Sequence, residues 1–445
     1  QYIMLAVVTI VMASCTSDIE ETTTTTGKNN VQLVVGEFPA FGDSQTRAIG
    51  TPDKGKTSWA EGDELLLEID NTSYGRHSAT FTYNGKSWEL TSGELVYREG
   101  DPAYIPHVYY APNYKWEAGK LVLKEGKDPG TDEYIEGNAR ITGNGETITV
   151  SFAGATRKYS RLRIATLPNE QITVDTEYFT PAGSSDMEQE GNYTLTSDEK
   201  GNAYLYGTFE NNSEVTVKYR EAALTTHTFS QATESAKSYA LDATVISANS
   251  AEEIKSAIEQ KVADGKTTIR LNLAPNAGTD EFMAIREAIK GAAPNDEGTI
   301  ELTIIGVETI PEEAFKRMSQ LKSVKMPDVK EIKKYAFSEC RYLTVVEAPS
   351  LNKLNSGAFD KCNLLSKLTF GPINYADARY WQIFEDITPN IDLILSDYQK
   401  EMIETDDDLY TANNDRDYAG SDEHNSKNFL GREFKSITCR YKVEY

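Results

Sequence analysis

The sequence predicts a multidomain, mainly β protein, in which two β-sandwich domains are followed by a short α/β repeat solenoid with an α/β cap. The chain has 445 residues, which is too long for one ordinary domain. Short runs of alternating apolar and polar residues, separated by turn signals, continue from Val31 to about Val245. A 22-residue repeat then follows, and a period of this length is typical of a solenoid.

Composition and charge narrow the range of partners. Hydrophobic residues make up 39% of the chain and aromatic residues 10%, which is enough apolar material for packed cores. The net charge is −24, so the chain should repel phosphates and anionic membrane surfaces, and we expect no nucleic acid partner. We interpret the acidity as surface charge that keeps the protein soluble. Acidic loops that hold Ca²⁺ are the alternative.

Residues 1–15 form an apolar run that ends in small residues and a cysteine. The run is too short to span a bilayer, and no Met or basic residue precedes it, so we expect a truncated signal peptide. Met12 to Cys15 resembles a bacterial lipobox, in which small residues admit the signal peptidase and Cys15 takes the lipid. A plain secretory signal is the alternative.

Three acidic residues follow this cysteine, namely Asp18, Glu20 and Glu21. They resemble the export tag of surface-exposed lipoproteins of Gram-negative bacteria, which implies an outer-membrane location and a membrane contact through the lipid alone. Residues 16–45 are Thr-rich at first and predict a disordered tether that runs into a first strand.

The β pattern from Val31 to about Val245 has a length that fits two sandwich domains. Turn signals such as Asn84-Gly85 separate the expected strands. We place the two domains at 46–166 and 167–246, with the boundary between Ala165 and Asn169.

An α/β cap is expected at 247–306. Ser250 and Glu253 form a capping box, so a helix should begin there and run to about Ala263. The other expected elements are a strand from Thr267 to Leu273, a helix from Asp280 to Ala292 and a strand from Thr299 to Ile305.

Residues 307–372 contain three copies of the repeat, with Ala-Phe pairs 22 residues apart that end at Phe315, Phe337 and Phe359. Because each unit hides its apolar face only by stacking on its neighbours, we expect these rings to lie above one another. Solenoids present broad surfaces that usually bind rather than catalyse. The candidate ligand contacts on the exposed strands are Lys322, Ser323, Lys325, Thr344, Glu347, Ser366, Lys367 and Thr369.

The chain holds three cysteines besides Cys15, which is too few for a disulfide scaffold. Cys340 and Cys362 occupy equivalent repeat positions, so they should lie one layer apart as buried thiols. A bridge between the layers is the alternative. Cys439 has no evident partner.

Residues 373–445 are expected to cap the far end of the repeats, with strands at Ile391–Leu395 and Ser436–Tyr441. An acidic loop at 406–423 lies between these strands and lacks EF-hand spacing. We interpret it as a solvated insertion and expect no metal or other cofactor; a Ca²⁺ site in this loop is the alternative. Trp381 is a candidate ligand contact because its ring could stack on a sugar.

The repeats resemble the BspA-like leucine-rich class. The match is carried by a spaced pattern over about 66 residues, and its second copy consists of Ile332, Ala336, Phe337, Cys340, Leu343, Val346 and Pro349. The resemblance implies a recognition surface, and the C-terminal residues look like the usual trailer of that class.

The N-terminal half resembles fimbrillin-like (Mfa-like) proteins. The resemblance rests on Thr46-Arg47-Ala48, Trp59-x-Glu61-Gly62-Asp63, Phe81 to Trp88 and Tyr109-Tyr110-Ala111-Pro112. It implies two fimbrillin-type sandwiches, a lipidated precursor, and a role in fimbriae or adhesion. It also implies cleavage by an Arg-specific protease at Arg47, which could otherwise be an ordinary tether residue. About 200 residues follow the second sandwich, which favours a tip, anchor or stand-alone surface protein over a shaft subunit.

Residue patterns for catalysis are missing from the sequence. The four His residues are far apart, and no nucleophile elbow, zinc-binding helix or phosphate loop is present. We therefore expect a binding protein for a protein or glycoprotein ligand rather than an enzyme. The alternatives are a minor fimbrial subunit with other subunits as partners, and a lipoprotein that captures glycans.

Overall fold

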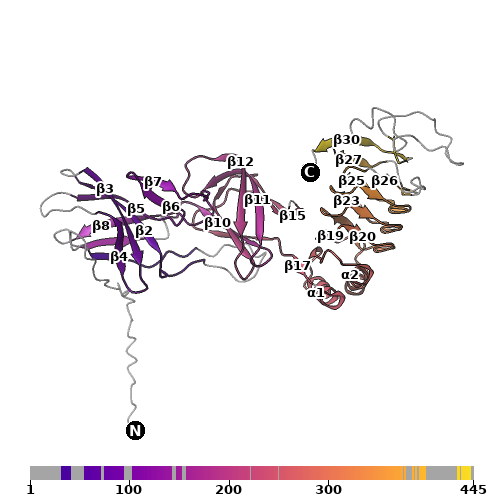
Figure 1. The fold of residues 1–445 in the computed structure, drawn as a ribbon, viewed down its shortest axis with the longest axis horizontal. Coiled ribbons are helices and arrows are strands. Elements are labelled where there is room, and N and C mark those ends of the chain that lie inside the picture. The colour runs from indigo at the N-terminus through magenta and orange to yellow at the C-terminus, as the bar shows by residue number, and fades with distance from the viewer. Residues whose placement is uncertain are drawn as a thin grey trace, which may run out of the picture.

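The computed structural model describes most of the chain between residues 32 and 441. The described ranges are 32–41, 55–71, 75–94, 103–142, 147–152, 157–220, 222–248, 250–373, 375–376, 383–384, 386–387, 390–396, 428–430 and 432–441. Figure 1 shows two β-rich bodies in a row and, beside them, a column of stacked strands with two helices at its lower end. We refer to these as the first, second and third units.

In the described residues, the first unit is a seven-stranded sheet with the strand order β1-β9-β8-β5-β2-β3-β4, and a separate β6-β7 hairpin lies beside it. Its strands are β1 (Gln32–Val35), β2 (Glu64–Asn71), β3 (Gly75–Tyr83), β4 (Trp88–Gly93), β5 (Ala103–Tyr110), β6 (Tyr114–Glu117), β7 (Lys120–Leu123), β8 (Ile135–Thr142) and β9 (Thr147–Ser151). All neighbours pair antiparallel except β1, which runs parallel to β9 at the edge.

The main core of the first unit lies on one face of this sheet. Leu65 and Leu67 of β2 point into this core, whereas Leu66 between them is buried in a smaller cluster on the opposite face, with Tyr109 and Tyr114. Strands from both ends of the sheet contribute to one cluster, which includes Leu33 and Phe81, so the sheet folds over on itself. Trp59 and Trp88 meet edge to face at 5.1 Å inside this cluster.

The second unit contains a sheet with the order β15-β14-β11-β13-β10-β16, in which β12 also pairs with β11. Its strands are β10 (Ser160–Ala165), β11 (Gln171–Pro181), β12 (Glu188–Thr196), β13 (Asn202–Phe209), β14 (Glu214–Tyr219), β15 (Ala222–Thr228) and β16 (Ser238–Asp242). A core of its own includes Val174, Phe179, Leu205 and Val215.

The expected boundary between residues 166 and 167 lies one strand too late. β10 pairs with β13 and β16, so this strand belongs to the second unit. The first unit also begins earlier than residue 46, because β1 pairs with β9, and Phe38 and Phe41 are buried in the first core. Turn signals mark the ends of strands but do not show which sheet each strand joins.

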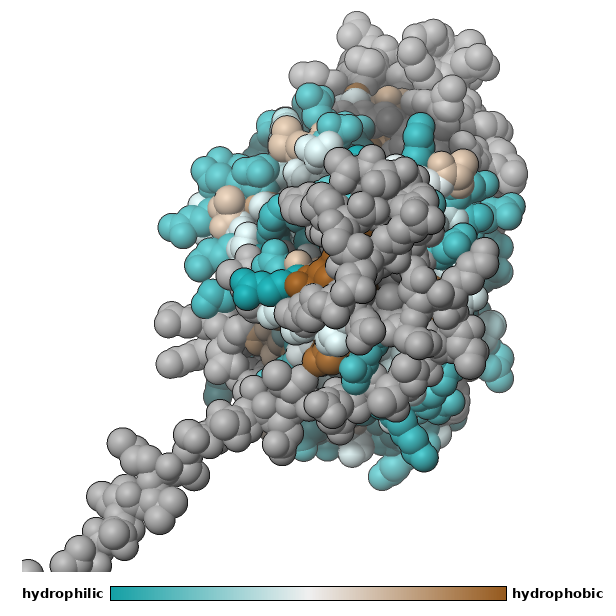
Figure 2. Space-filling view, turned by 90° about the vertical axis from the view of Figure 1, so that its left-hand side faces the viewer, coloured by the Kyte–Doolittle hydropathy of each residue, from teal (hydrophilic) through white to brown (hydrophobic). Residues whose placement is uncertain are grey.

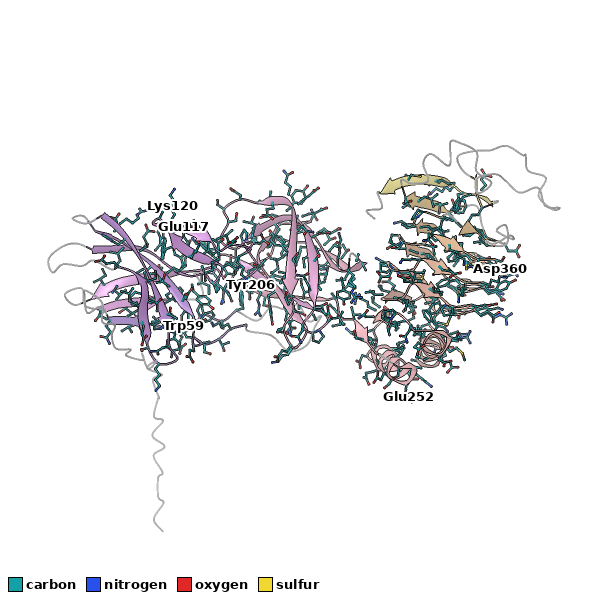
Figure 3. All side chains as sticks on the ribbon, viewed as in Figure 1. Trp59, Glu117, Lys120, Tyr206, Glu252 and Asp360 are labelled. Atoms are coloured by element: carbon teal, nitrogen blue, oxygen red, sulfur yellow. The ribbon has the colours of Figure 1, made fainter. Side chains whose placement is uncertain are left out.

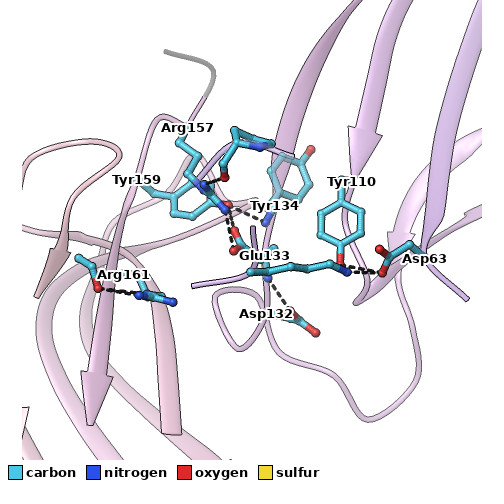
Figure 4. A network of polar contacts seen from close by, with 11 residues as sticks. Asp63, Tyr110, Asp132, Glu133, Tyr134, Arg157, Tyr159 and Arg161 are labelled. Atoms are coloured by element: carbon cyan, nitrogen blue, oxygen red, sulfur yellow. Dashed lines mark hydrogen bonds and ion pairs between the residues drawn. The ribbon is translucent and has the colours of Figure 1, made fainter. Parts of the chain in front are cut away.

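A buried polar network joins the first two units (Figure 4). The Arg157 guanidinium donates to the Glu133 carboxylate at 2.7 Å and to the carbonyl of Pro39. The Tyr159 hydroxyl donates to the other oxygen of Glu133 at 2.7 Å. Burial and the Glu133 charge raise the pKa of Tyr159 well above its usual value, so this hydroxyl stays protonated.

Phe41 lies where the two units meet. The guanidinium carbon of Arg157 is 3.8 Å from the centre of its ring, and that of Arg161 is 4.7 Å away. Arg161 comes from β10 and binds the Ser238 hydroxyl through two nitrogens at 3.1 and 3.0 Å. The N-terminal segment is therefore held by cation–π contacts as well as by strand pairing.

The described part of the third unit contains an eight-stranded parallel sheet and a smaller four-stranded parallel sheet. Its helices are α1 (Ala251–Ala263) and α2 (Thr279–Ala292). The larger sheet has the order β17 (Ile246–Ser247), β18 (Thr268–Asn272), β19 (Ile300–Ile305), β21 (Leu321–Lys325), β23 (Val345–Ala348), β25 (Lys367–Phe370), β27 (Asp392–Ser396) and β30 (Ser436–Tyr441). The smaller sheet has β20 (Thr309–Ile310), β22 (Glu331–Ile332), β24 (Lys353–Leu354) and β26 (Tyr375–Ala376), and a hairpin contains β28 (Asn428–Phe429) and β29 (Arg432–Glu433).

A stack of phenylalanine rings runs through the coils of the third unit. Phe315 and Phe337 lie 5.2 Å apart, and Phe337 and Phe359 lie 5.5 Å apart, with interplanar angles of 18° and 8°. Phe384 continues the stack 5.8 Å beyond Phe359, and Phe282 of α2 closes the other end edge to face. The helices thus cover the first coil, as a terminal repeat requires.

Each coil turns twice through the left-handed backbone region on its Ala-Phe side. The residues with positive φ recur every 22 positions, as Glu313, Tyr335 and Gly357 and as Arg317, Glu339 and Lys361. At Gly357 an added Cβ would lie 2.3 Å from the Tyr335 ring, so the third copy requires glycine there for space, although the first two copies adopt the same backbone conformation with Glu and Tyr.

The second and third units pack directly against each other. Arg270 of β18 is buried, and its Nε donates to the carbonyl of Leu224 in β15 at 2.6 Å. Ile305, which ends β19, is fully buried and belongs to the core cluster of the second unit. The first strands of the larger sheet are therefore covered by the second unit.

The prediction of a multidomain, mainly β chain is confirmed. Ser250 begins α1, and its hydroxyl accepts from the Glu253 amide at 3.3 Å. Within the described ranges, no helix is both long and apolar enough to cross a membrane.

Candidate binding face

The larger sheet of the third unit presents one side to the core and the other outward. Val324, Val346 and Leu368 occupy one register row of β21, β23 and β25 and are fully buried. Because successive residues of a strand point to opposite sides, the residues on either side of this row point outward. We call this outward set, together with Lys322, the strand face. Lys322 lies two residues before Val324 but is exposed, because the regular alternation fails at the start of β21. The members of the strand face are Lys322, Ser323, Lys325, Val345, Glu347, Lys367 and Thr369.

The structure brings most of the predicted contact residues together on this face. Ser323, Val345 and Lys367 form one register row, and Lys325, Glu347 and Thr369 form a second row two residues further on. Val345 was missed because its apolar side chain resembles a core residue in the sequence. Val345 could have been identified from its position equivalent to Ser323 in the next coil.

Thr344 and Ser366 also form hydrogen bonds within the repeats, and their role as ligand contacts stays a prediction. Each precedes a strand, and its hydroxyl donates to a carbonyl of the neighbouring coil. The Thr344 Oγ1 binds the Lys322 oxygen at 2.8 Å, and the Ser366 Oγ binds the Thr344 oxygen at 3.0 Å. These two side chains tie the coils together.

Ion pairs run across the strand face from coil to coil. Lys322 binds Glu301 at 2.8 Å, and Glu347 lies 3.4 Å from Lys325 and 4.0 Å from Lys367. The hydrogen bond to Glu301 and its negative charge raise the pKa of Lys322, so this lysine is charged at physiological pH. Exposed pairs of this kind are weak, so a partner can rearrange them at little cost.

The local charge of the repeats differs from that of the chain as a whole. Residues 307–372 contain 11 Lys and Arg against 8 Asp and Glu, whereas the full chain contains 45 against 69. A slightly basic segment in a strongly acidic protein attracts partners that the other units would repel.

The strand face is bounded at one end by the second unit and continues at the other. Arg270 and Ile305 lie under the second unit, so the open part begins at β21. Beyond β25, Asp392 and Ile394 of β27 extend the two rows. Figure 3 labels Asp360 on the opposite side of the column, where the Ala-Phe turns lie.

The cysteines of the repeats are free and structural. Cys340 Sγ donates to the Phe315 carbonyl and Cys362 Sγ to the Phe337 carbonyl, both at 3.0 Å. Burial raises the pKa of the Cys340 thiol to about 12 and that of Cys362 well above its usual value. Both are protonated and unreactive at neutral pH. The alternative of a bridge between layers is wrong, and Cys439 forms no disulfide with any described residue.

Three predicted site residues, Cys15, Arg47 and Trp381, lie outside the described residues, as does the acidic loop at 406–423. In the described part of the chain, no group of three or more His, Cys, Asp or Glu side chains could hold a metal ion.

Comparison with known families identifies the repeats. Residues 299–389 match the family model described as a BspA type leucine rich repeat region (6 copies). No curated protein and no solved structure matches the chain. The predicted resemblance of the repeats is confirmed, and the match extends beyond residues 307–372 at both ends. A leucine-rich repeat region of this type indicates protein–protein binding or adhesion at a surface.

Proposed function

We propose that this protein is a surface-anchored binding or adhesion lipoprotein without catalytic activity. Its two β-rich units form a stalk, and the strand face of the leucine-rich repeats binds a protein or glycoprotein of a host or neighbouring bacterial cell. A lipid on Cys15 holds the chain in the outer membrane, with the repeats facing outward.

The observation that carries this proposal is the repeat region with its open, ordered strand face. Stacked coils give that face a rigid shape before any partner arrives, which lowers the entropic cost of binding. The contact between Arg270 and Leu224 couples the face to the second unit. In contrast, Figure 2 shows the far end of the first unit with mainly hydrophilic described residues and only scattered hydrophobic ones, as a stalk requires.

Charge reversal on the strand face should weaken binding. We expect the triple variant K322E/K325E/K367E to lose at least about tenfold in affinity, because like charges in an interface repel and the face becomes strongly acidic. The measurement is the binding of the immobilised protein to arrays of glycans, matrix proteins and bacterial surface proteins.

The matched control reverses three cations on the turn side of the same coils, K316E/R317E/K361E. This variant changes the net charge equally but should keep its affinity within about twofold. If the protein binds to none of the arrays, or if both variants lose affinity equally, binding through the strand face is contradicted.

A second candidate is a minor fimbrial subunit, at the tip or the anchor, that assembles by strand addition. It rests on the fimbrillin-like resemblance and on the position of β1. Among the described strands, β1 lies at the sheet edge and pairs with β9 alone, and Arg47 follows it in the sequence. Removal of β1 would expose a row of backbone groups on β9 that a strand from another subunit could bind.

An Arg-specific protease provides the test of this candidate. We expect cleavage at Arg47, release of the segment that holds β1, and association of the trimmed protein through the exposed edge of β9, measured by mass spectrometry and size-exclusion chromatography. The Arg47→Gln variant should resist the cut and stay unassociated. A protein that is not cut near Arg47, or that is cut and never associates, rules this candidate out.

A further inference from the structure

A pocket of about 440 Å³ lies where the first and second units meet, away from the strand face. One wall comes from the first unit and the linker, through Tyr134, Glu136 and Lys158. The opposite wall comes from the second unit, through Thr180, Thr208 and the turn at 182–185. Seams between units are a preferred place for small-ligand sites, and this volume lies within the range of such sites.

The walls of the pocket are held in place by the fold. The Ala182 amide donates to the Tyr206 carbonyl at 2.9 Å, and the Ala182 carbonyl accepts from the Gly130 amide at 3.2 Å. Gly183 has a φ of 87°, and a Cβ there would lie 2.4 Å from the Tyr114 hydroxyl. The turn therefore packs closely against the Tyr114 and Tyr134 pair, and the pocket is preformed.

The lining combines three chemical groups. Tyr134 and Pro181 supply apolar surface, Thr180 and Thr208 supply hydroxyls from paired strands, and Glu136 and Lys158 supply an exposed ion pair at 2.9 Å. The single positive and single negative charge leave the site neutral, which does not favour an anion or a cation. Ligands with many hydroxyls and an apolar face fit such a lining, since hydroxyls both donate and accept and C–H groups pack on an aromatic ring.

We propose that this pocket binds a neutral saccharide unit, one or two sugar residues in size. The paired charges of Glu136 and Lys158 accept from and donate to ring hydroxyls, and the Tyr134 side of the pocket packs against the C–H face of the sugar. The site lies between the stalk units, so its occupancy is independent of binding at the strand face.

The test is ligand-observed NMR of the full chain with a panel of neutral monosaccharides and disaccharides. We expect at least one sugar to bind with a millimolar Kd. The pocket-filling Thr208→Trp and the Lys158→Ala variant, which removes a charged hydrogen-bond donor, should each weaken binding by about tenfold. Thr194→Trp, an equal change on the exposed side of β12, should bind as the natural chain does.

Lys158→Ala keeps the test decisive if the tryptophan in the pocket prevents folding, because Lys158 is exposed and its loss should not affect stability. Absence of binding across the whole panel overturns the proposal. Binding that both pocket variants leave unchanged also overturns it. Because the strand-face variants do not touch this pocket, failure of one proposal leaves the other standing.

Discussion

Replacing Phe337 by alanine should lower the free energy of unfolding of the repeat region by about 3–5 kcal/mol. The ring is fully buried between Phe315 and Phe359, at 5.2 and 5.5 Å. Its loss creates a cavity in the middle of the stack, where the coils on both sides lose contacts and neither can collapse into the gap. In a repeat architecture, stability depends on such contacts between neighbours, so the effect should spread along the column.

Labelling of the buried thiols of Cys340 and Cys362 measures this loss of stability directly. Both are fully buried, so a thiol reagent reaches them only when the coils open. Phe337→Ala should speed their labelling in moderate urea by orders of magnitude, followed peptide by peptide with mass spectrometry. Lys333→Ala, at an exposed position of the same coil, should change stability by no more than about 0.5 kcal/mol. Equal labelling rates in the two variants would show that the ring stack does not stabilise the coils.

The repeats were predictable because their physics is local and periodic. The 22-residue spacing predicts the ring stack, and the capping residue Ser250 predicts the start of α1. Phe384 was missed because the step from Phe359 lengthens to 25 residues, which breaks the period while the ring still stacks. A search for a fixed sequence period finds the repeats that match it but misses a coil that carries an insertion.

The contacts between units were not predictable because they depend on distant parts of the chain. Ile305 ends a strand with an apolar residue, and nothing near it in sequence shows that the second unit covers it. Arg270 resembles an exposed strand residue until the Leu224 carbonyl, 46 positions earlier, is brought to it. The pocket between the first and second units was not predictable for the same reason, since its walls come from four separate segments.

Removing one partner of a single buried ion pair should strongly destabilise the first unit. Glu133→Ala should destabilise that unit by about 3–5 kcal/mol, because it leaves the Arg157 charge buried and unpaired. The two side chains meet at 2.7 Å and are 5% and 0% exposed. Urea unfolding followed by tryptophan fluorescence measures this effect, because Trp59 and Trp88 both lie in the first core.

A neighbouring ion pair has a similar N–O distance but is exposed, so comparing the two pairs shows how much burial adds to the effect on stability. Glu136 and Lys158 lie 2.9 Å apart but are 41% and 77% exposed, so Glu136→Ala should cost no more than about 1 kcal/mol. A double variant, Glu133→Leu with Arg157→Met, removes both buried charges and should recover at least half of the loss, because an apolar pair leaves no charge uncompensated. If the double variant is as unstable as Glu133→Ala, the cost lies in the broken hydrogen bonds to Tyr159 and Pro39 rather than in the unpaired charge. The main role of Arg157 would then be to hold the N-terminal segment in place through its hydrogen bond to the Pro39 carbonyl.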